Sequence, residues 1–136
     1  MDDRYTLLDD LPTAEEFCRL REVSGLSPKS LAAARIGLPN SVLGVCVREA
    51  GRTVGMGRVI GDGGTVFQIV DIAVEPEHQG QGLGKAIMAR IMTRLKQLAP
   101  GAYVSLIADG DARHLYAQYG FAPVAPASIG MATLLP

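Results

Sequence analysis

The sequence has 136 residues, of which 48% are hydrophobic and 20% are charged, and its formal net charge at pH 7 is -1. This composition excludes an intrinsically disordered chain, and the near-zero net charge provides no basic surface for nucleic acid or for an anionic membrane. We therefore expect one globular domain, residues 1–136, that buries a core of its own and whose partner is a small molecule.

The chain begins with MDDRYTLLDD, in which residues 5–8 are a weak candidate for a first strand. This stretch is acidic and lacks the basic and apolar regions of a secretory signal, and no apolar run in the chain reaches membrane-spanning length. Cys18 and Cys46 have neither disulfide-motif nor metal-site spacing, and Cys46 is expected to be a buried free thiol. We expect a soluble, cytoplasmic protein.

Two short helices are predicted before the first strong strand. Thr13 and Glu16 match the capping box, in which each side chain bonds the backbone N–H of the other residue, so a helix is predicted over residues 13–23. The pair Ser27-Pro28 is typical of a second helix start, and Gly37 is placed to end that helix.

Three strands with tight turns follow. Residues 41–50 and 52–60 flank Ala50-Gly51 as a hairpin, and a glycine-rich turn then leads into TVFQIVDIAV, residues 65–74. These strands form an antiparallel meander. The last of them is apolar on both faces apart from Gln68 and Asp71, which is typical of a central strand.

The second half of the chain is predicted to alternate helices and strands. Apolar residues recur at helical spacing over residues 83–98, and Pro100-Gly101 ends that helix. Residues 102–108 are interpreted as a buried strand, 111–120 as a short helix and 131–135 as a closing strand. The predicted fold class is α/β: a mixed central sheet, with an antiparallel N-terminal meander followed by βαβα-β, and with helices on both faces.

The third strand of the meander runs directly into HQGQGLGK, residues 78–85. The first N–H groups of a helix lack partners, the helix dipole favours anions there, and glycines let a phosphate approach closely. The P-loop pattern GxxxxGK[ST] fails here because Gly80 and Gly84 are too close and Ala86 follows Lys85. The dinucleotide pattern GxGxxG fails because Lys85 stands in place of its last glycine.

The pattern [RQ]-x-x-G-x-[GA] fits residues 79–84, and here the sequence resembles the GCN5-related N-acetyltransferase (GNAT) superfamily, in particular small bacterial acetyltransferases. Members of this family bind the pyrophosphate of acetyl-CoA at this turn. VDIAVEPEHQGQGLG is similar to the family's strand, turn and helix, and Ala112, Tyr116, Gly120 and Phe121 match a second signature. The resemblance implies one GNAT domain over 1–136, acetyl-CoA as co-substrate, no metal, and these cofactor-binding residues: Ile72, Ala73, Val74, Gln79, Gly80, Gln81, Gly82, Leu83, Gly84, Lys85, Asp109, Ala112 and Tyr116.

The resemblance also implies roles in the reaction. The strand before the turn is expected to diverge from its neighbour at a bulge, so that the backbone of residues 72–74 bonds the pantetheine arm and faces the thioester. Tyr116 matches the family tyrosine that protonates the departing CoA sulfur, and phenol and thiol have ordinary pKa values close enough for that transfer. The alternative for Tyr116 is a ring packed on an amphipathic helix. Asp109 stands where many relatives carry asparagine.

Asp71 has two interpretations. A carboxylate in an apolar strand has its pKa raised by burial, and it could take the ammonium proton of an acceptor or recognise a cationic acceptor. It could equally be a structural acid bonded to backbone or to Arg58. The resemblance to small bacterial GNAT proteins implies that Asp71 and Gln68 line the acceptor side, with the first two helices and the loop 126–130 as walls.

Other polar residues near the turn are assigned simpler roles. Glu75 and Glu77 are expected to be solvated, and His78 and His114 to lie on the surface. Lys85 either adds charge near the phosphates or points to solvent.

The predicted activity is transfer of acetyl from acetyl-CoA to a primary amine of a small molecule by direct attack. The alternatives are acetylation of a protein lysine or N-terminus, and a non-catalytic CoA-binding sensor. No nucleic-acid or membrane partner is expected, and the family resemblance implies a homodimer formed through strands near the C-terminus.

Overall fold

The computed structural model describes residues 1–136, which form two compact units, Met1–Leu106 and Ile107–Pro136. The first unit contains the whole β-sheet. The second contains a 3-10 turn, Gly110–Ala112, and the short helix α4, Arg113–Ala117. The single domain expected over residues 1–136 stays a prediction.

The sheet has five strands in the spatial order of the sequence: β1 (Tyr5–Leu8), β2 (Leu43–Glu49), β3 (Arg52–Gly61), β4 (Val66–Val74) and β5 (Tyr103–Leu106). Strands β1 to β4 pair antiparallel, and β5 pairs parallel to β4. The sheet is therefore mixed, and the predicted α/β class is confirmed. The weak first strand and the hairpin at Ala50 and Gly51 also form as predicted.

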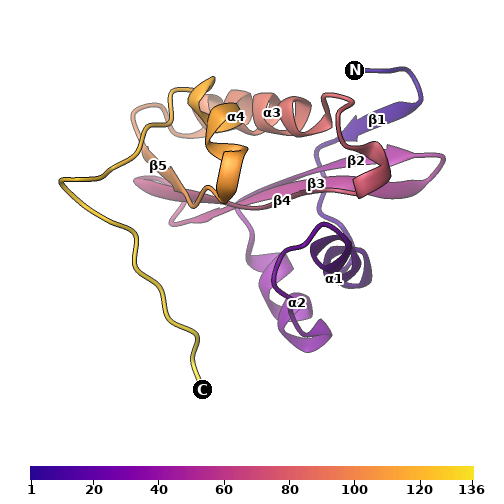
Figure 1. Ribbon diagram of the computed structural model, residues 1–136, viewed down its shortest axis with the longest axis horizontal. Helices are drawn as coiled ribbons and strands as arrows, with labels where there is room; N and C mark the ends of the chain where they lie inside the picture. Colours follow the sequence, from indigo (N-terminus) through magenta and orange to yellow (C-terminus); the bar gives the residue numbers. More distant parts are fainter. The chain divides into compact units, whose positions relative to one another are not determined.

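Helices cover both faces of this sheet. Helix α3 (Leu83–Leu98) lies on one face, and α1 (Ala14–Val23) and α2 (Leu31–Gly37) lie on the other (Figure 1). The capping box at the start of α1 is present, with the backbone N–H of Glu16 donating to Thr13 Oγ1 at 3.1 Å and that of Thr13 donating to Glu16 Oε1 at 2.9 Å. None of the helices combines the length and the hydropathy that crossing a membrane requires.

The core has one layer on each side of the sheet. On the α3 side, the helix buries a stripe of residues at helical spacing, which are Leu83, Ile87, Met88, Ile91 and Leu95. Gly57 of β3 lies beneath this stripe, and a Cβ there would come within 2.6 Å of Ile72 Cδ1 and 2.7 Å of Ile87 Cγ2. Glycine at this position therefore lets α3 pack closely on the sheet. On the other face, the main cluster consists of Phe17, Leu20, Ala34, Leu38, Met56 and Ala73.

Cys46 lies in the middle of this core, in β2. It pairs with Leu8 of β1 on one side and with Met56 of β3 on the other, and none of its surface is exposed. Burial raises the pKa of its thiol to about 12. The expected buried free thiol is confirmed.

The second helix begins later than predicted. It starts at Leu31 because Ser30 supplies the cap, accepting a bond from the backbone N–H of Ala33 at 3.0 Å. Ser27 is instead engaged by Arg21, which donates to both its carbonyl oxygen and its hydroxyl. The start predicted at Ser27-Pro28 was therefore wrong.

Two predictions about the later strands were also wrong. Strand β5 is shorter than residues 102–108, and Tyr103 within it and Ile107 beyond it are exposed rather than buried. Residues 131–135 form no strand, and Met131, Leu134 and Leu135 are almost fully exposed. A strand needs a neighbour to satisfy its backbone groups, and the unit to which this segment belongs contains none.

Candidate active site

Strand β4 is interrupted by a β-bulge. Arg58 of β3 pairs with Val70, whereas Met56 pairs with Ala73, so Asp71 and Ile72 together lie opposite Gly57. Asp71 has a φ of 60°, in the left-handed region that non-glycine residues rarely adopt. The bulge therefore lies at the segment to which the resemblance assigns the thioester.

On its other side, β4 separates from β5 before the bulge. The two strands pair from Val66 with Tyr103 to Ile69 with Leu106, where β5 ends. No strand pairs with residues 70–74 on that side, so the backbone of Ile72, Ala73 and Val74 lies along an open sheet edge. An extended ligand arm can bond such an edge as an added strand does.

The glycine-rich turn follows directly and begins α3. Gly80 and Gly82 have φ of 77° and 81°, and a Cβ at either would have no atom within 4 Å. Gly82 is the N-cap of α3, which has no side-chain cap and no acidic residue in its first turn. The bare first turn of α3 therefore has the charge and the space to bind a phosphate. Lys85 is exposed in this turn.

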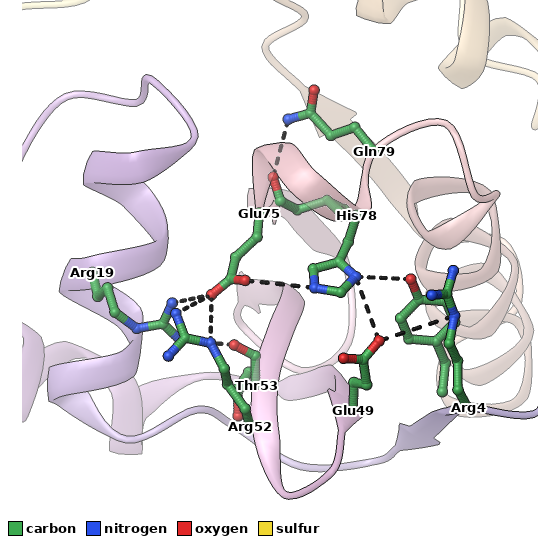
Figure 2. A network of polar contacts seen from close by, with 10 residues as sticks. Arg4, Arg19, Glu49, Arg52, Thr53, Glu75, His78 and Gln79 are labelled. Carbon is green, nitrogen blue, oxygen red and sulfur yellow. Dashed lines mark hydrogen bonds and ion pairs between the residues drawn. The ribbon is translucent and has the colours of Figure 1, made fainter.

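Glu75, which connects β4 to this turn, is buried rather than solvated as expected. Only 4% of its surface is exposed, and Arg19 of α1 and Arg52 of β3 both donate to its carboxylate (Figure 2). Although burial alone would raise the pKa of Glu75, the hydrogen bonds from Arg52 and Arg19 hold it below its ordinary value. The backbone N–H of Glu75 also donates to the carbonyl of Val54 at 2.8 Å, so this residue fixes the base of the turn.

His78 is the second residue for which the expected surface role was wrong. Its side chain is 16% exposed, and Nδ1 lies 2.8 Å from the hydroxyl of Tyr5, whose ring meets the imidazole edge to face. Its two ring nitrogens also lie 3.7 Å from Glu49 and 3.8 Å from Glu75, as Figure 2 shows. Next to it, the amide of Gln79 donates to the carbonyl of Val74 at 3.0 Å. The residues leading into the glycine-rich turn are thus bonded to β1, β2, β3 and α1.

The carboxylate of Asp71 is buried between two guanidinium groups. Arg21 of α1 donates to Oδ1, and Arg58 of β3 donates from Nε to Oδ2 at 2.5 Å. The contact with Arg58 is the one that the structural interpretation of Asp71 predicts. Gln68 lies in the same strand before the bulge and is half-buried.

The remaining predicted site residues belong to the second unit. Asp109 precedes the 3-10 turn that contains Ala112, and Tyr116 lies in α4. Burial raises the pKa of the Tyr116 phenol, and the charge of Asp109 raises it further. The structure thus divides the predicted site between residues 68–85 of the first unit and residues 109–116 of the second.

A groove of about 380 Å³ lies between α1 and α2. It is lined by Leu11, Pro12, Ala14, Glu15, Ala34, Arg35, Leu38 and Pro39. These residues come from the beginning of α1 and the segment before it, and from α2 and the 3-10 turn after it. Arg21, which contacts Asp71, lies near the other end of α1. The groove therefore does not involve the end of α1 that reaches the bulge.

Arg21, Arg19 and Tyr5 were not predicted to take part in the site. For Arg21 the sequence did hold a signal, because it follows Phe17 and Leu20 at the spacing that places all three on one helix face. A charged residue on an apolar face needs a buried partner, and the acid inside the apolar strand was the available one. Arg19 and Tyr5 carry no comparable pattern.

Residues 20–130 match the domain family described as acetyltransferase (GNAT) domain. The crystal structure of a probable acetyltransferase of unknown function from meticillin-resistant Staphylococcus aureus has 49% sequence identity and a TM-score of 0.92, with 96% of this chain and 99% of that one covered.

Two named plant proteins are similar over part of the chain. The GCN5-related N-acetyltransferase 2 of Arabidopsis thaliana chloroplasts is 39% identical over 70 residues, and the serotonin N-acetyltransferase 2 of rice chloroplasts is 40% identical over 86 residues. These matches cover 52% and 62% of this chain, and the chain spans 27% and 42% of the two plant proteins. On the family match and the full-length structural similarity together, the chain belongs to the GNAT superfamily of N-acetyltransferases.

Proposed function

We propose that this protein transfers the acetyl group of acetyl-CoA to a primary amine of a small molecule by direct attack. The observation that supports this best is the continuity of β4 with the turn. The open, bulged edge of β4 leads within a few residues to the start of α3, which has no side-chain cap. One ligand can therefore form hydrogen bonds to the backbone of β4 with one part and place its phosphate at the first N–H groups of α3 with another.

In this proposal, the pyrophosphate binds residues 79–85 at the start of α3. The helix dipole and the unpaired N–H groups favour the negative charge there. The pantetheine arm then lies along residues 72–74, where no strand occupies the edge of β4. This arrangement brings the thioester to the bulge.

The reaction forms a bond between the amine nitrogen and the acetyl carbon and breaks the bond between that carbon and sulfur. A backbone N–H of residues 72–74 stabilises the negative charge that develops on the carbonyl oxygen. Tyr116 donates its proton to the departing thiolate, and its raised pKa keeps the phenol protonated at neutral pH. The proton that the attacking amine nitrogen loses passes through water to the Tyr116 oxygen and restores the phenol. No protein nucleophile is needed.

The acceptor is proposed to be a small amine because the rice relative is named for serotonin, and its match covers 62% of this chain. Asp109 and Ala112 are proposed to contact the cofactor, and Gln68 to line the acceptor side. The two alternatives are acetylation of a protein lysine or N-terminus, and CoA sensing without turnover.

The test is release of CoA thiol from acetyl-CoA, followed with a colour reagent, in the presence of amine panels. The panels are polyamines, arylalkylamines, aminoglycosides, amino acids and lysine peptides, with a reaction lacking acceptor as control. Calorimetry with acetyl-CoA runs in parallel, so that cofactor binding is measured separately from turnover.

Each outcome decides between the alternatives. Thiol release with one class of small amine supports the proposal and identifies the acceptor class, whereas release only with lysine peptides favours the protein acceptor. Binding of acetyl-CoA without release with any panel favours the sensor. Failure to bind acetyl-CoA contradicts the proposed function altogether.

A further inference from the structure

The backbone conformation of Asp71 is uncommon for a residue other than glycine. Its φ of 60° is in the left-handed region, where a side chain costs energy and glycine does not. Glycine would therefore form the same bulge with less strain. An aspartate at this position indicates that the side chain has a role that offsets the strain.

The side chain of Asp71 is buried and forms ion pairs with two arginines. Its exposed fraction is 7%, and its two oxygens accept from Arg21 and Arg58, whose side chains are themselves 9% and 17% exposed. Both guanidinium groups also lie over the ring of Phe17, at 5.9 Å and 5.6 Å from its centre. Asp71, Arg21 and Arg58 form one buried, charged group, which we call the bulge clamp.

The two arginines of the bulge clamp also form hydrogen bonds to two segments that are not part of the sheet. Arg21 donates to the carbonyl oxygen of Ser27 at 2.9 Å and to its hydroxyl at 3.0 Å, which ties it to the connection between α1 and α2. Arg58 donates to the hydroxyl of Ser41, before β2, at 3.0 Å. The bulge is thereby bonded to α1, β3 and both of these segments.

We infer that Asp71 is a positioning residue, which acts through Arg21 and Arg58 to hold the backbone of residues 71–74 ready for the thioester. This inference rests on the proposed function. It differs from a role as general base, because a proton accepted by Asp71 would leave two buried guanidinium groups without their anion, an arrangement that is strongly unfavourable.

The inference is tested with acetyl-CoA alone, which requires no acceptor. Hydrogen exchange of the backbone amides is measured in the wild-type chain and in Asp71→Asn, with and without acetyl-CoA, and acetyl-CoA affinity is measured by calorimetry. In the wild type, acetyl-CoA should protect residues 70–75 and residues 79–85. In Asp71→Asn, protection of 79–85 should remain, protection of 70–75 should be lost, and affinity should fall about tenfold.

Companion variants separate positioning from folding and from acid–base chemistry. Arg58→Gln should reproduce the loss of protection and affinity, whereas Arg58→Lys should keep most of both. Asp71→Asn combined with Arg58→Gln should bind acetyl-CoA no worse than the weaker single variant, because both changes break the same clamp. Asp71→Gly keeps the left-handed backbone without the side chain and should also lose protection of 70–75. Asp9→Asn is the matched control, since Asp9 pairs with Arg90 and Arg94 of α3 instead.

Two results would overturn the inference in different ways. Wild-type affinity and wild-type protection of 70–75 in both Asp71→Asn and Asp71→Gly would refute the bulge clamp and leave the proposed function intact. Absence of acetyl-CoA binding by the wild-type chain would remove the proposed function and the inference together.

Discussion

Tyr116 is the residue whose chemistry can be tested most directly. Burial raises the pKa of its phenol above the ordinary value of 10.0, and the Asp109 charge acts in the same direction. A proton donor for a thiolate has to remain protonated at the working pH, and this pKa ensures it.

We therefore expect Tyr116→Phe to lower kcat for thiol release by about 10²–10⁴-fold, with acetyl-CoA affinity unchanged by calorimetry. In the wild type, the fall in kcat that comes from ionising the phenol should have its midpoint above the ordinary phenol pKa of 10.0. Tyr119→Phe, in the same short segment, is the control. An unaltered kcat in Tyr116→Phe would exclude this tyrosine from the proton transfer.

Glu75 gives a prediction about stability and pH. Its pKa in the folded chain is below the ordinary value of 4.5, so the ionised carboxylate stabilises the fold above that pH, and the stabilisation is lost as pH falls through the folded-state pKa. Replacing Glu75 by Gln should lower the unfolding free energy at pH 7 by about 2 kcal/mol, because Arg19 and Arg52 lose their anion.

Urea unfolding at pH 7 and at pH 3 measures this effect. The wild type should lose more unfolding free energy between the two pH values than Glu75→Gln does. Glu77→Gln is the control, since Glu77 is exposed two positions further along the chain. Equal acid sensitivity of wild type and Glu75→Gln would show that the two arginines do not stabilise this carboxylate.

At the scale of elements, the start of α3 is the feature on which the proposed cofactor binding depends. Replacing Gly82 by Ala adds a Cβ to the open space before the first N–H groups and imposes the cost of a positive φ. The space is what a phosphate needs, so the substitution should weaken acetyl-CoA binding about tenfold or more while costing about 1 kcal/mol of stability.

Gly63→Ala is a matched control for this change. Gly63 has a φ of 86°, its Cβ would also meet no atom within 4 Å, and it lies in the turn between β3 and β4. Calorimetry should show the loss of acetyl-CoA affinity only for Gly82→Ala, and urea unfolding should show a similar loss of stability for both. Equal affinity of the two variants would place the phosphate elsewhere.

The elements themselves were largely predictable because their signals are local. Capping at Thr13, the turn at Ala50-Gly51 and the apolar stripe of α3 each depend on neighbouring residues alone, and each is present in the structure. The glycine-rich turn could be found for the same reason. Residues 131–135 have an equally apolar pattern, yet a strand also requires a partner, which no local pattern specifies.

The contacts of charged side chains across elements were not predictable in this way. Glu75 and His78 were expected in solvent because their local sequence is polar, whereas Arg19 and Arg52 bury the first and Tyr5 covers the second. These partners lie between 23 and 73 positions away along the chain. Only the folded sheet brings them together, so the support of the glycine-rich turn is a property of the tertiary structure.

At the scale of the whole molecule, the exposed apolar residues at the C-terminal end lead to a prediction about assembly. Met131, Leu134 and Leu135 are each at least 88% exposed, and β5 pairs with only one strand. We expect the protein to be a homodimer in which residues 131–135 lie in the interface, because association would bury these side chains.

Light scattering at micromolar protein concentration measures the molecular mass in solution and so distinguishes a dimer from a monomer. The wild type should have the mass of a dimer, and the double variant Met131→Glu with Leu135→Glu the mass of a monomer. Ile36→Glu is the control, because Ile36 is 72% exposed on α2 and is not part of this segment. A monomeric wild type would defeat the prediction.

The thiol of Cys46 makes separation of α1 and α2 from the sheet measurable without any added label. A thiol reacts as its thiolate, and burial raises the pKa of the Cys46 thiol to about 12. Cys46 points to the same face of the sheet as its partner Met56, which packs against α1 and α2, so it reacts with an alkylating reagent only when these helices have separated from the sheet. Cys18 on α1 is half-buried, with its sulfur 3.4 Å from the carbonyl of Lys29, and reacts after a much smaller opening. The ratio of the two alkylation rates therefore reports the difference in free energy between a local opening around Cys18 and separation of the helices from the sheet.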